Sequence, residues 1–561
     1  MDKEEIIRNI QTIIKAEPGK LNGPLYSISR RQMARLCLDA GEELNAIYHL
    51  TESHGVGLRQ ATLFEIAREE GNFRLDADIV SFTKGYAKRE AEGMLERLKE
   101  MPSEWTIVQV TREYDPFELF NPRCPETSPK LKGFHITRLP CGNAPSQLPL
   151  TVESCWPADA LKDPVEGFWN VKKKLKMRQG VSSCIRKLRK EAADEAESYC
   201  RDFGRMALKQ WVVLFLGKLC DKNLENEIRK KIDEVLKKYP EVTKRQRYVI
   251  YLLAEGSVHL RDEELDDGIF SITIKNETLQ DELYETITNI REDYSSLPVQ
   301  RRYPVILILD EHLDLLPWEN LLIFRRHPFS RVPSLHFAHS LYMLHKNEIK
   351  NGLRMFLREL PENEICYYIV NPEGDLPTVE ENLAKFLKKR FPNWVGIIGK
   401  KPSQEELISA LTKSNTFVYC GHGSGSQYMA SETVSKLKVK PVQLLFGCSS
   451  VALKDHGGIV EMTGDVLQYA VAGSGCTVGM LWAVTSHDTD LMTMNIANLW
   501  LPGTAIDVKT FEPLPEGKVK KEPELLRAIK ESREVASLFT NKAAFIARGI
   551  PIKIVTGDKN L

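Results

Sequence analysis

Six short apolar segments recur through the second half of the chain, and helical patterns separate them. The segments are "YPVILILDE" (303–311), "CYYIVNP" (366–372), "WVGIIGK" (394–400), "TFVYCGHG" (416–423), "VQLLFGCSS" (442–450) and "CTVGMLWAVT" (476–485). Nearly continuous apolar runs of this length are typical of strands buried on both faces of a sheet. Strands that alternate with helices predict an α/β sandwich with a largely parallel sheet.

The first half of the chain is richer in helical patterns. Apolar residues recur at helical spacing in 4–14 and 30–50, whereas 104–114 and 133–141 alternate as strands do. A Pro-rich loop at 115–129 separates these two strands. From about 160 to 255 the pattern is helical again, and its most apolar window, "WVVLFLGKLC" at 211–220, predicts a buried helix that is too short to span a bilayer.

The composition excludes several classes of function. The 561 residues carry 77 Lys plus Arg and 77 Asp plus Glu, so no global field recruits nucleic acid or membrane. A basic run at 171–180 lies close to an acidic stretch, and we interpret it as a solvated face. The 11 cysteines show no CxxC spacing and follow no signal peptide, which indicates reduced thiols and argues against a structural zinc site. We therefore expect the cytosol or nucleus as the compartment.

Two neighbouring strand ends carry reactive side chains. His422 and Cys448 follow consecutive predicted strands, and sites in parallel sheets form at the carboxyl ends of strands. A thiol becomes an effective nucleophile when a base raises its thiolate fraction, and His422 can supply that base. The glycines at 421, 423 and 425 allow close approach of a substrate backbone. The N–H groups of Gly423 and Cys448 could then donate to the oxyanion of acyl transfer.

These strand ends also admit two other interpretations. A glycine-rich turn after a strand can cradle phosphate, but "GHGSGS" lacks the Lys-Ser/Thr ending of a phosphate loop. Alternatively, Cys448 is a buried small hydrophobe and His422 a hydrogen-bonded turn residue, which is the commoner fate of either residue alone. Their matching positions at two strand ends favour chemistry.

Several stretches resemble the catalytic core of separase, the clan CD cysteine protease that opens cohesin at anaphase. They are 417–458 with GHGSG and FGCSS, 305–342 with LPWE and an R-x-P-S stretch, "YYIVNPEGDLPTVEENL" (367–383) and "LWAVTSHDTD" (481–490). Together the resemblance spans about 300 to 505. It implies a caspase-like three-layer sandwich with His422 as general base and Cys448 as nucleophile. The family needs no third orienting carboxylate, no cofactor and no metal.

The resemblance also implies cleavage after Arg within an E-x-x-R consensus. A carboxylate is the appropriate partner for the Arg guanidinium, because the two form bidentate charge-assisted bonds. The family segment reads W-D-V-T-D-x-D-I-D, and its last Asp maps onto Asp490. Ala483 and Ser486 replace the first two Asp residues here, so Asp488 is a second candidate.

Two acidic residues beyond the nucleophile have two candidate roles. Asp455 and Glu461 could shape the substrate pocket or cap the helix expected to begin near residue 462.

The domain organisation and the partners follow from the same resemblance. We expect residues 1–297 to form a helix-rich, pseudoprotease-like, substrate-supporting domain with a helical insert at about 160–255, and residues 298–561 to form the active protease. The implied substrate is the kleisin subunit of cohesin, and the implied inhibitor is securin, bound as a pseudosubstrate. Action on mitotic chromosomes, in cytoplasm and nucleus, would follow. The chain is either a compact member whose helical arm is a separate subunit or a catalytic fragment.

Two competing functions remain open. A bacterial CHAT-domain protease shares the GHG and Cys strand ends, although the LPWE and R-x-P-S stretches argue against it. A catalytically dead scaffold would hold a partner without cutting it, which the intact His–Cys pair disfavours.

Overall fold

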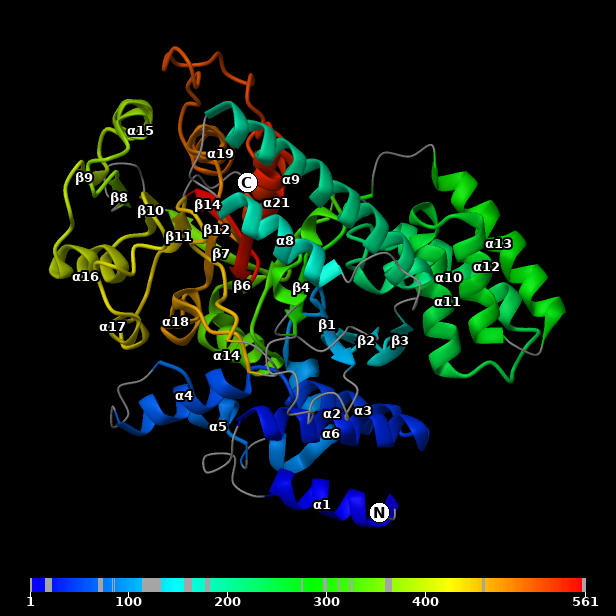
Figure 1. Cartoon of the computed structure of the whole chain (residues 1–561). Coiled ribbons are helices and arrows are strands. Elements are labelled where there is room, and N and C mark those ends of the chain that lie inside the picture. Colours follow the sequence, from blue (N-terminus) through cyan, green and yellow to red (C-terminus); the bar gives the residue numbers. More distant parts are fainter. Residues whose placement is uncertain are drawn as a thin grey trace.

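The structure is a computed structural model of the chain (Figure 1). It describes residues 3–15, 23–68, 74–82, 84, 86–113, 133–155, 164–176, 182–273, 276–295, 300–310, 313–321, 324–325, 327–358, 366–456 and 460–556. The Pro-rich loop expected at 115–129 lies outside the described residues.

An 11-stranded sheet forms the centre of the molecule, with the order β3-β2-β1-β4-β5-β13-β12-β11-β10-β8-β9. Seven of its ten strand pairings are parallel, and β1–β2, β2–β3 and β12–β13 are antiparallel. The prediction of an α/β fold with a largely parallel sheet is therefore confirmed. The strands are β1 Thr106–Glu113, β2 Gly133–Pro140, β3 Leu150–Cys155, β4 Val305–Leu309, β5 Phe329–Arg331, β8 Cys366–Val370, β9 Val395–Ile398, β10 Thr416–Cys420, β11 Val442–Leu445, β12 Cys476–Met480 and β13 Phe545–Gly549.

The described residues form α-helices on both faces of this sheet and, between residues 222 and 295, at one end of it. They are α1 Lys3–Lys15, α2 Gly23–Asp39, α3 Glu43–Glu52, α4 Val56–Arg68, α5 Ala77–Val80, α6 Tyr86–Glu100, α8 Pro164–Lys176, α9 Ser182–Phe203, α10 Lys222–Leu236, α11 Lys244–Gly256, α12 Asp262–Thr273, α13 Glu277–Ser295, α14 Leu335–His345, α15 Pro377–Arg390, α16 Gln404–Lys413, α17 Ser431–Ser435, α18 Asp465–Val471, α19 Ser486–Trp500, α20 Leu525–Arg533 and α21 Phe539–Ala544. A small second sheet joins β14 (Ile552–Thr556), β7 (Leu353–Arg358) and β6 (Ile349–Lys350).

The alternation of side chains along β1 and β4 divides the core between the two faces. Ile107, Ile306 and Ile308 pack against α3, α6 and α14 in one apolar cluster. Val108 and Leu307 point the other way, into the larger cluster that includes the helices from α8 onward. Because successive strand residues face opposite sides, fully apolar strands bury both faces, and a three-layer arrangement results.

The helical insert is longer than the sequence pattern indicated. It was expected at about 160–255, but helices continue to Ser295, and α10 to α13 form a group at the right-hand end of the sheet in Figure 1. The buried helix expected at 211–220 is only partly present, since a 3₁₀ segment ends at Phe215. A Cβ on Gly217 would lie 1.9 Å from the Tyr303 carbonyl oxygen, so the chain there runs extended against 301–303.

The segment 30–50, expected to be one helix, belongs to two helices. α2 ends at Asp39, and Gly41, with a φ of +78°, turns the chain into α3.

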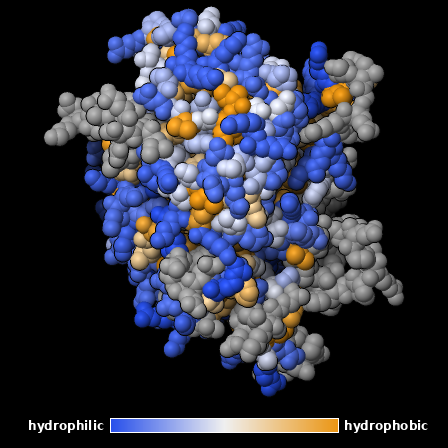
Figure 2. Space-filling model, turned by 90° about the vertical axis from the view of Figure 1, so that its left-hand side faces the viewer, coloured by the Kyte–Doolittle hydropathy of each residue, from blue (hydrophilic) through white to orange (hydrophobic). Residues whose placement is uncertain are grey.

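The sheet is continuous across the expected boundary between residues 297 and 298. β1 of the first segment pairs in parallel with β4 of the second, from Thr106 opposite Val305 to Val110 opposite Leu309. At the opposite end, the sheet finishes in the edge strand β9. Figure 2 shows that side of the molecule as mostly hydrophilic with scattered apolar residues, consistent with a solvated edge. Among the described residues, no helix combines the length and apolar character needed to cross a membrane.

Candidate active site

His422 and Cys448 lie at the same edge of the sheet, just beyond β10 and β11. These two strands are parallel neighbours, paired from Thr416 opposite Val442 to Tyr419 opposite Leu445. Both side chains line one open cleft of about 660 Å³. The cleft is also lined by Lys176, Glu373, Asp375, Gly423, Ser449 and Ala483.

The two loops that carry the pair are in direct backbone contact. A Cβ added to Gly447 would lie 1.9 Å from the carbonyl oxygen of Gly423 and 2.7 Å from that of Gly421. Only glycine permits this approach, which keeps the His422 loop beside the Cys448 loop. The Tyr419 hydroxyl donates to the His422 carbonyl at 2.7 Å and further fixes the turn.

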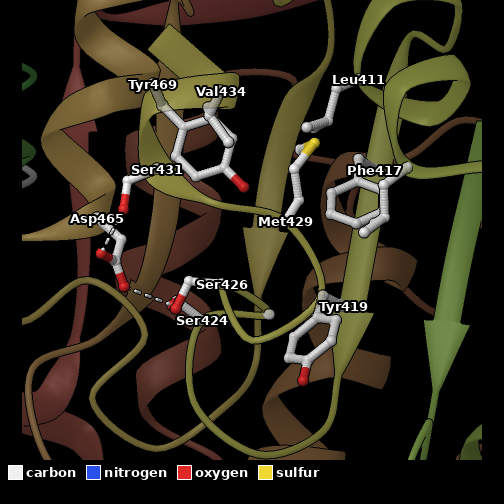
Figure 3. Close-up of a pocket in the computed structure, with 12 residues that line it drawn as sticks. Leu411, Phe417, Tyr419, Ser424, Ser426, Met429, Ser431, Val434, Asp465 and Tyr469 are labelled. Atoms are coloured by element: carbon white, nitrogen blue, oxygen red, sulfur yellow. Dashed lines mark hydrogen bonds between the residues drawn. The ribbon is translucent and has the colours of Figure 1, made fainter. Parts of the chain in front are cut away.

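Asp465, the first residue of α18, binds the glycine-rich loop that follows His422 (Figure 3). The hydroxyls of Ser424 and Ser431 donate to its two carboxylate oxygens at 3.3 and 2.9 Å. Burial opposes ionisation, but hydrogen bonds from Ser426 and Ser431 outweigh it and hold the pKa of Asp465 below its ordinary value. These hydrogen bonds connect the loop that bears His422 to α18.

Cys448 sits on a sharp turn. Ser449, the next residue, has a φ of +57°, an uncommon conformation for a residue with a side chain. Its N–H donates to the Trp482 carbonyl at 3.0 Å, which holds the turn against the end of β12. The half-buried thiol of Cys448 donates to the Val484 carbonyl at 3.6 Å.

The N–H groups of Gly423 and Cys448 were the expected oxyanion donors. Within the described part of the chain, neither N–H donates a hydrogen bond to another group. Gly423 lines the cleft, with a φ of +64°.

Asp375 contacts His422, and the sequence reasoning did not identify it. The Nε2 atom of His422 lies 3.1 and 3.0 Å from the two carboxylate oxygens of Asp375. Asp375 follows β8, which pairs with β10 on the side away from β11. The signal was an acidic residue after a predicted strand, but only the strand order shows that this strand adjoins the one before His422.

The two candidate Arg-binding carboxylates have different surroundings. Asp488 is buried and accepts hydrogen bonds from Ser537 N–H (3.0 Å) and hydroxyl (2.9 Å), from Leu538 N–H (3.4 Å) and from the Asn541 side-chain amide (2.6 Å). It thus anchors the start of α21. Asp490 is also buried, and burial raises its pKa to about 7, although a hydrogen bond from Asn382 partly offsets the effect.

Asp490 lies beneath the strand end that precedes His422. Burial, together with the charge of Asp490, raises the pKa of Cys420, the last residue of β10, well above its ordinary value. Neither Asp488 nor Asp490 is among the residues that line the cleft itself.

The other two acidic candidates lie elsewhere. The buried carboxylate of Glu461 accepts from the N–H groups of Gly57 (2.5 Å) and Leu58 (3.3 Å), so it caps α4 rather than the helix that follows it. Burial raises the pKa of Glu461. Asp455, partly exposed, acts electrostatically on Lys172.

One cluster in the described part of the chain has ligands suited to a cation. Ligand atoms of Glu373, Asp375 and His422 all lie within 4.8 Å of one another. A metal there would compete for Nε2 of His422 with the hydrogen bond to Asp375.

The similarity of this chain to known proteins is consistent across sequence and fold. The model of the separin protease domain matches residues 173–489. Mouse separin is 35% identical over 201 residues, which are 36% of this chain and 9% of that protein. Separin of Schizosaccharomyces pombe is 30% identical over 309 residues, or 55% of this chain and 15% of that protein.

Two crystal structures of the Saccharomyces cerevisiae separase–securin complex share the fold. Their TM-scores are 0.70 and 0.67, at 16% and 18% sequence identity. The alignments cover 99% and 98% of this chain but only 38% of each separase chain. The chain therefore spans well under half the length of the relatives it matches. Because the family model covers more than half of the chain, the chain belongs to the separin protease-domain family.

Proposed function

We propose that the chain is a separase-type cysteine endopeptidase that cleaves peptide bonds after Arg, with Cys448 as nucleophile and His422 as general base. The observation that carries this proposal is the placement of the two side chains at neighbouring strand ends in one open cleft. The close contact of Gly447 with Gly421 and Gly423 holds the two loops together.

The reaction follows from these groups. His422 takes the thiol proton, and the thiolate of Cys448 attacks the carbonyl carbon of the scissile bond. The N–H groups of Gly423 and Cys448 receive the oxyanion. His422 then protonates the departing amine, and a thioester remains on Cys448. Water, deprotonated by the same imidazole, hydrolyses the thioester and restores the thiol.

Asp490 is the better candidate for recognition of the substrate Arg. The carboxylate of Asp488 already has four donors, whereas Asp490 has one hydrogen bond to Asn382 and an elevated pKa. A guanidinium inserted from the cleft would supply the missing charge and two parallel hydrogen bonds. The preferred site would be E-x-x-R.

The physiological role is proposed on family membership. The substrate would be the kleisin subunit of cohesin, cut on mitotic chromosomes by an enzyme of the cytoplasm and nucleus. Securin, the partner of separase in both yeast structures, would bind here as a pseudosubstrate. Residues 1–297 would support the substrate, and a helical arm would come from a separate subunit or from further chain.

Cleavage of a fluorogenic peptide with a kleisin-like E-x-x-R site tests the proposal. Cys448→Ser should remove activity, and Asp490→Asn should lower kcat/KM for the Arg peptide by roughly 100-fold. A matched peptide with citrulline in place of Arg is the control, because it keeps the shape and loses the charge. In Asp490→Asn, the difference in kcat/KM between the Arg peptide and the citrulline peptide should be smaller than in the wild type.

Other outcomes would point to the alternatives. Cleavage without preference for Arg over citrulline would indicate a different caspase-like protease. A folded wild type that neither cuts the peptide nor reacts at Cys448 with an Arg-ending acyloxymethyl ketone would indicate a scaffold.

A further inference from the structure

We propose that Asp375 is the positioning residue for His422: it holds the imidazole in the tautomer that leaves Nδ1 free to take the proton of Cys448. This inference rests on the proposed His–Cys chemistry. It adds a third member to a pair that the sequence resemblance describes as sufficient.

The contact is specific to one ring nitrogen. Both carboxylate oxygens of Asp375 lie within 3.1 Å of Nε2, and a carboxylate can only accept. The proton of the neutral ring must therefore lie on Nε2, and the lone pair must lie on Nδ1. In the described part of the chain no group forms a hydrogen bond with Nδ1, so that atom is available in the cleft shared with Cys448.

The loop that presents Asp375 is fixed by hydrogen bonds of the backbone and side chain of Asn371. The N–H of Asn371 donates to the Cys420 carbonyl at 2.8 Å, which ties the loop to the residue two positions before His422. Asn371 has a φ of +49°, and its side-chain oxygen accepts from the Leu376 N–H at 2.9 Å. Its side-chain amide donates to Glu380 at 2.8 Å, in the first turn of α15. Asp375 thus lies within a closed turn, one residue before its end.

The exposure of the Asp375 carboxylate indicates that it acts mainly by selecting the tautomer and orientation of His422. Its side chain is 57% exposed and that of His422 is 35% exposed, so water screens much of the attraction between a carboxylate and an imidazolium. Selection of the tautomer and of the ring orientation does not depend on that attraction. The other charged groups that line the cleft are Lys176 and Glu373.

The proton is accounted for at each step. The Cys448 S–H bond breaks and its proton moves to Nδ1, which gives an imidazolium whose Nε2–H stays on Asp375. The Nδ1 proton then goes to the departing amine, and the original tautomer returns. Asp375 gains no proton.

Three substitutions of Asp375 distinguish positioning from a structural role. Asp375→Asn keeps the size of the side chain, but its amide can donate to Nε2 and so favours the tautomer with the proton on Nδ1. Asp375→Ala removes the contact, and Asp375→Glu keeps the carboxylate. The measurements are kcat/KM for the E-x-x-R peptide and the rate of Cys448 alkylation by iodoacetamide across pH.

We expect Asp375→Asn to slow both reactions by roughly 10- to 100-fold, at least as much as Asp375→Ala does, with partial recovery in Asp375→Glu. Glu381→Gln is the matched control, since it removes one exposed carboxylate on α15, where Glu381 pairs with Lys385, away from the cleft. It should match the wild type.

The results have defined meanings. If Asp375→Asn stays within about threefold of the wild type in both assays, or slows cleavage without slowing alkylation, the inference is overturned. Loss in Asp375→Ala with full activity in Asp375→Asn would also overturn it, because shape alone would then suffice. Alkylation needs no substrate, so an Asp375-dependent rate in a chain that cuts no peptide would uphold the inference and refute the proposed function.

Discussion

Replacing Asp490 by Asn should stabilise the fold at alkaline pH, although it removes the carboxylate proposed to bind the substrate Arg. Asp490 is only 4% exposed, and its described surroundings supply one hydrogen bond, from Asn382, and no cation. Asn has the same shape and can keep that hydrogen bond. It carries no charge that burial penalises.

The magnitude follows from the pKa. Burial raises the pKa of Asp490 from an ordinary 3.8 to about 7. At about 1.36 kcal/mol per pKa unit, this difference corresponds to roughly 4 kcal/mol, and relaxation around a buried charge reduces it to about 2–4 kcal/mol. Because the folded state holds the proton more tightly than the unfolded state, the penalty is absent below pH 3.8. It grows as the pH rises towards 7 and is constant above that.

Calorimetric melting of wild type and Asp490→Asn at about pH 5 and about pH 8.5 measures the effect. The variant should melt several degrees higher at the alkaline pH, and the gap should shrink to less than half at the acidic pH. Asp488→Asn is a matched control on the same helix. Its carboxylate accepts hydrogen bonds from Ser537, Leu538 and Asn541, so the same chemical change should destabilise the fold by about 1–3 kcal/mol.

Two results would refute this reasoning. A lower melting temperature for Asp490→Asn at alkaline pH would mean that the carboxylate is well solvated or paired in solution. An equal gap at both pH values would mean that the effect of the substitution does not come from the charge of Asp490.

Two further substitutions test how the site is held together. Gly447→Ala places a methyl group 1.9 Å from the Gly423 carbonyl oxygen, so it should separate the two catalytic loops and lower kcat/KM at least tenfold. Gly204→Ala is the control, because its methyl group meets no atom within 4 Å and kcat/KM should stay unchanged. Normal activity in Gly447→Ala would contradict the close packing. Glu319→Gln removes the bidentate carboxylate partner of the buried Arg331 guanidinium and leaves only the Asp314 carboxylate, 3.4 Å away, which should cost about 3 kcal/mol in thermal or urea unfolding. Glu319→Leu with Arg331→Met should cost less, and an equal loss in both variants would argue against an ionic cause.

The local pattern of the sequence was sufficient for the elements around the site. All six strands expected in the second half are present as β4, β8, β9, β10, β11 and β12. For β4, β8, β10, β11 and β12 the apolar runs contain the information, because a strand buried on both faces must be apolar. β9 is the exception, since it is the edge strand and its Val395 is exposed. The order of the strands was not accessible in the same way. β13, from the end of the chain, inserts between β5 and β12, and such pairing depends on packing between distant segments.

The motifs that carried the family resemblance have a physical explanation in the fold. Glu319 of LPWE and Arg331 of the R-x-P-S stretch form a bidentate ion pair at 2.8 and 2.7 Å, and both side chains are almost fully buried. Arg331 also donates to the Leu316 carbonyl at 2.9 Å. Replacing either partner of this buried pair would leave the charge of the other partner poorly compensated and destabilise the fold. The two motifs, whose paired residues are 12 positions apart in the sequence, therefore serve one structural contact.

The choice between Asp488 and Asp490 shows where sequence reasoning reached its limit. Asp488 and Asp490 are two positions apart on α19, so their side chains point about 200° apart and only one of them can face the β10 side. The rotation of α19 about its axis is set by packing against α15 and α20, which no local pattern specifies. The structure directs Asp488 to the start of α21, where four hydrogen bonds satisfy its carboxylate, and Asp490 towards Cys420. Burying a carboxylate without a cation costs free energy, and a substrate guanidinium would remove that cost. The lack of a cation beside Asp490 therefore favours Asp490 over Asp488 as the residue proposed to bind the substrate Arg.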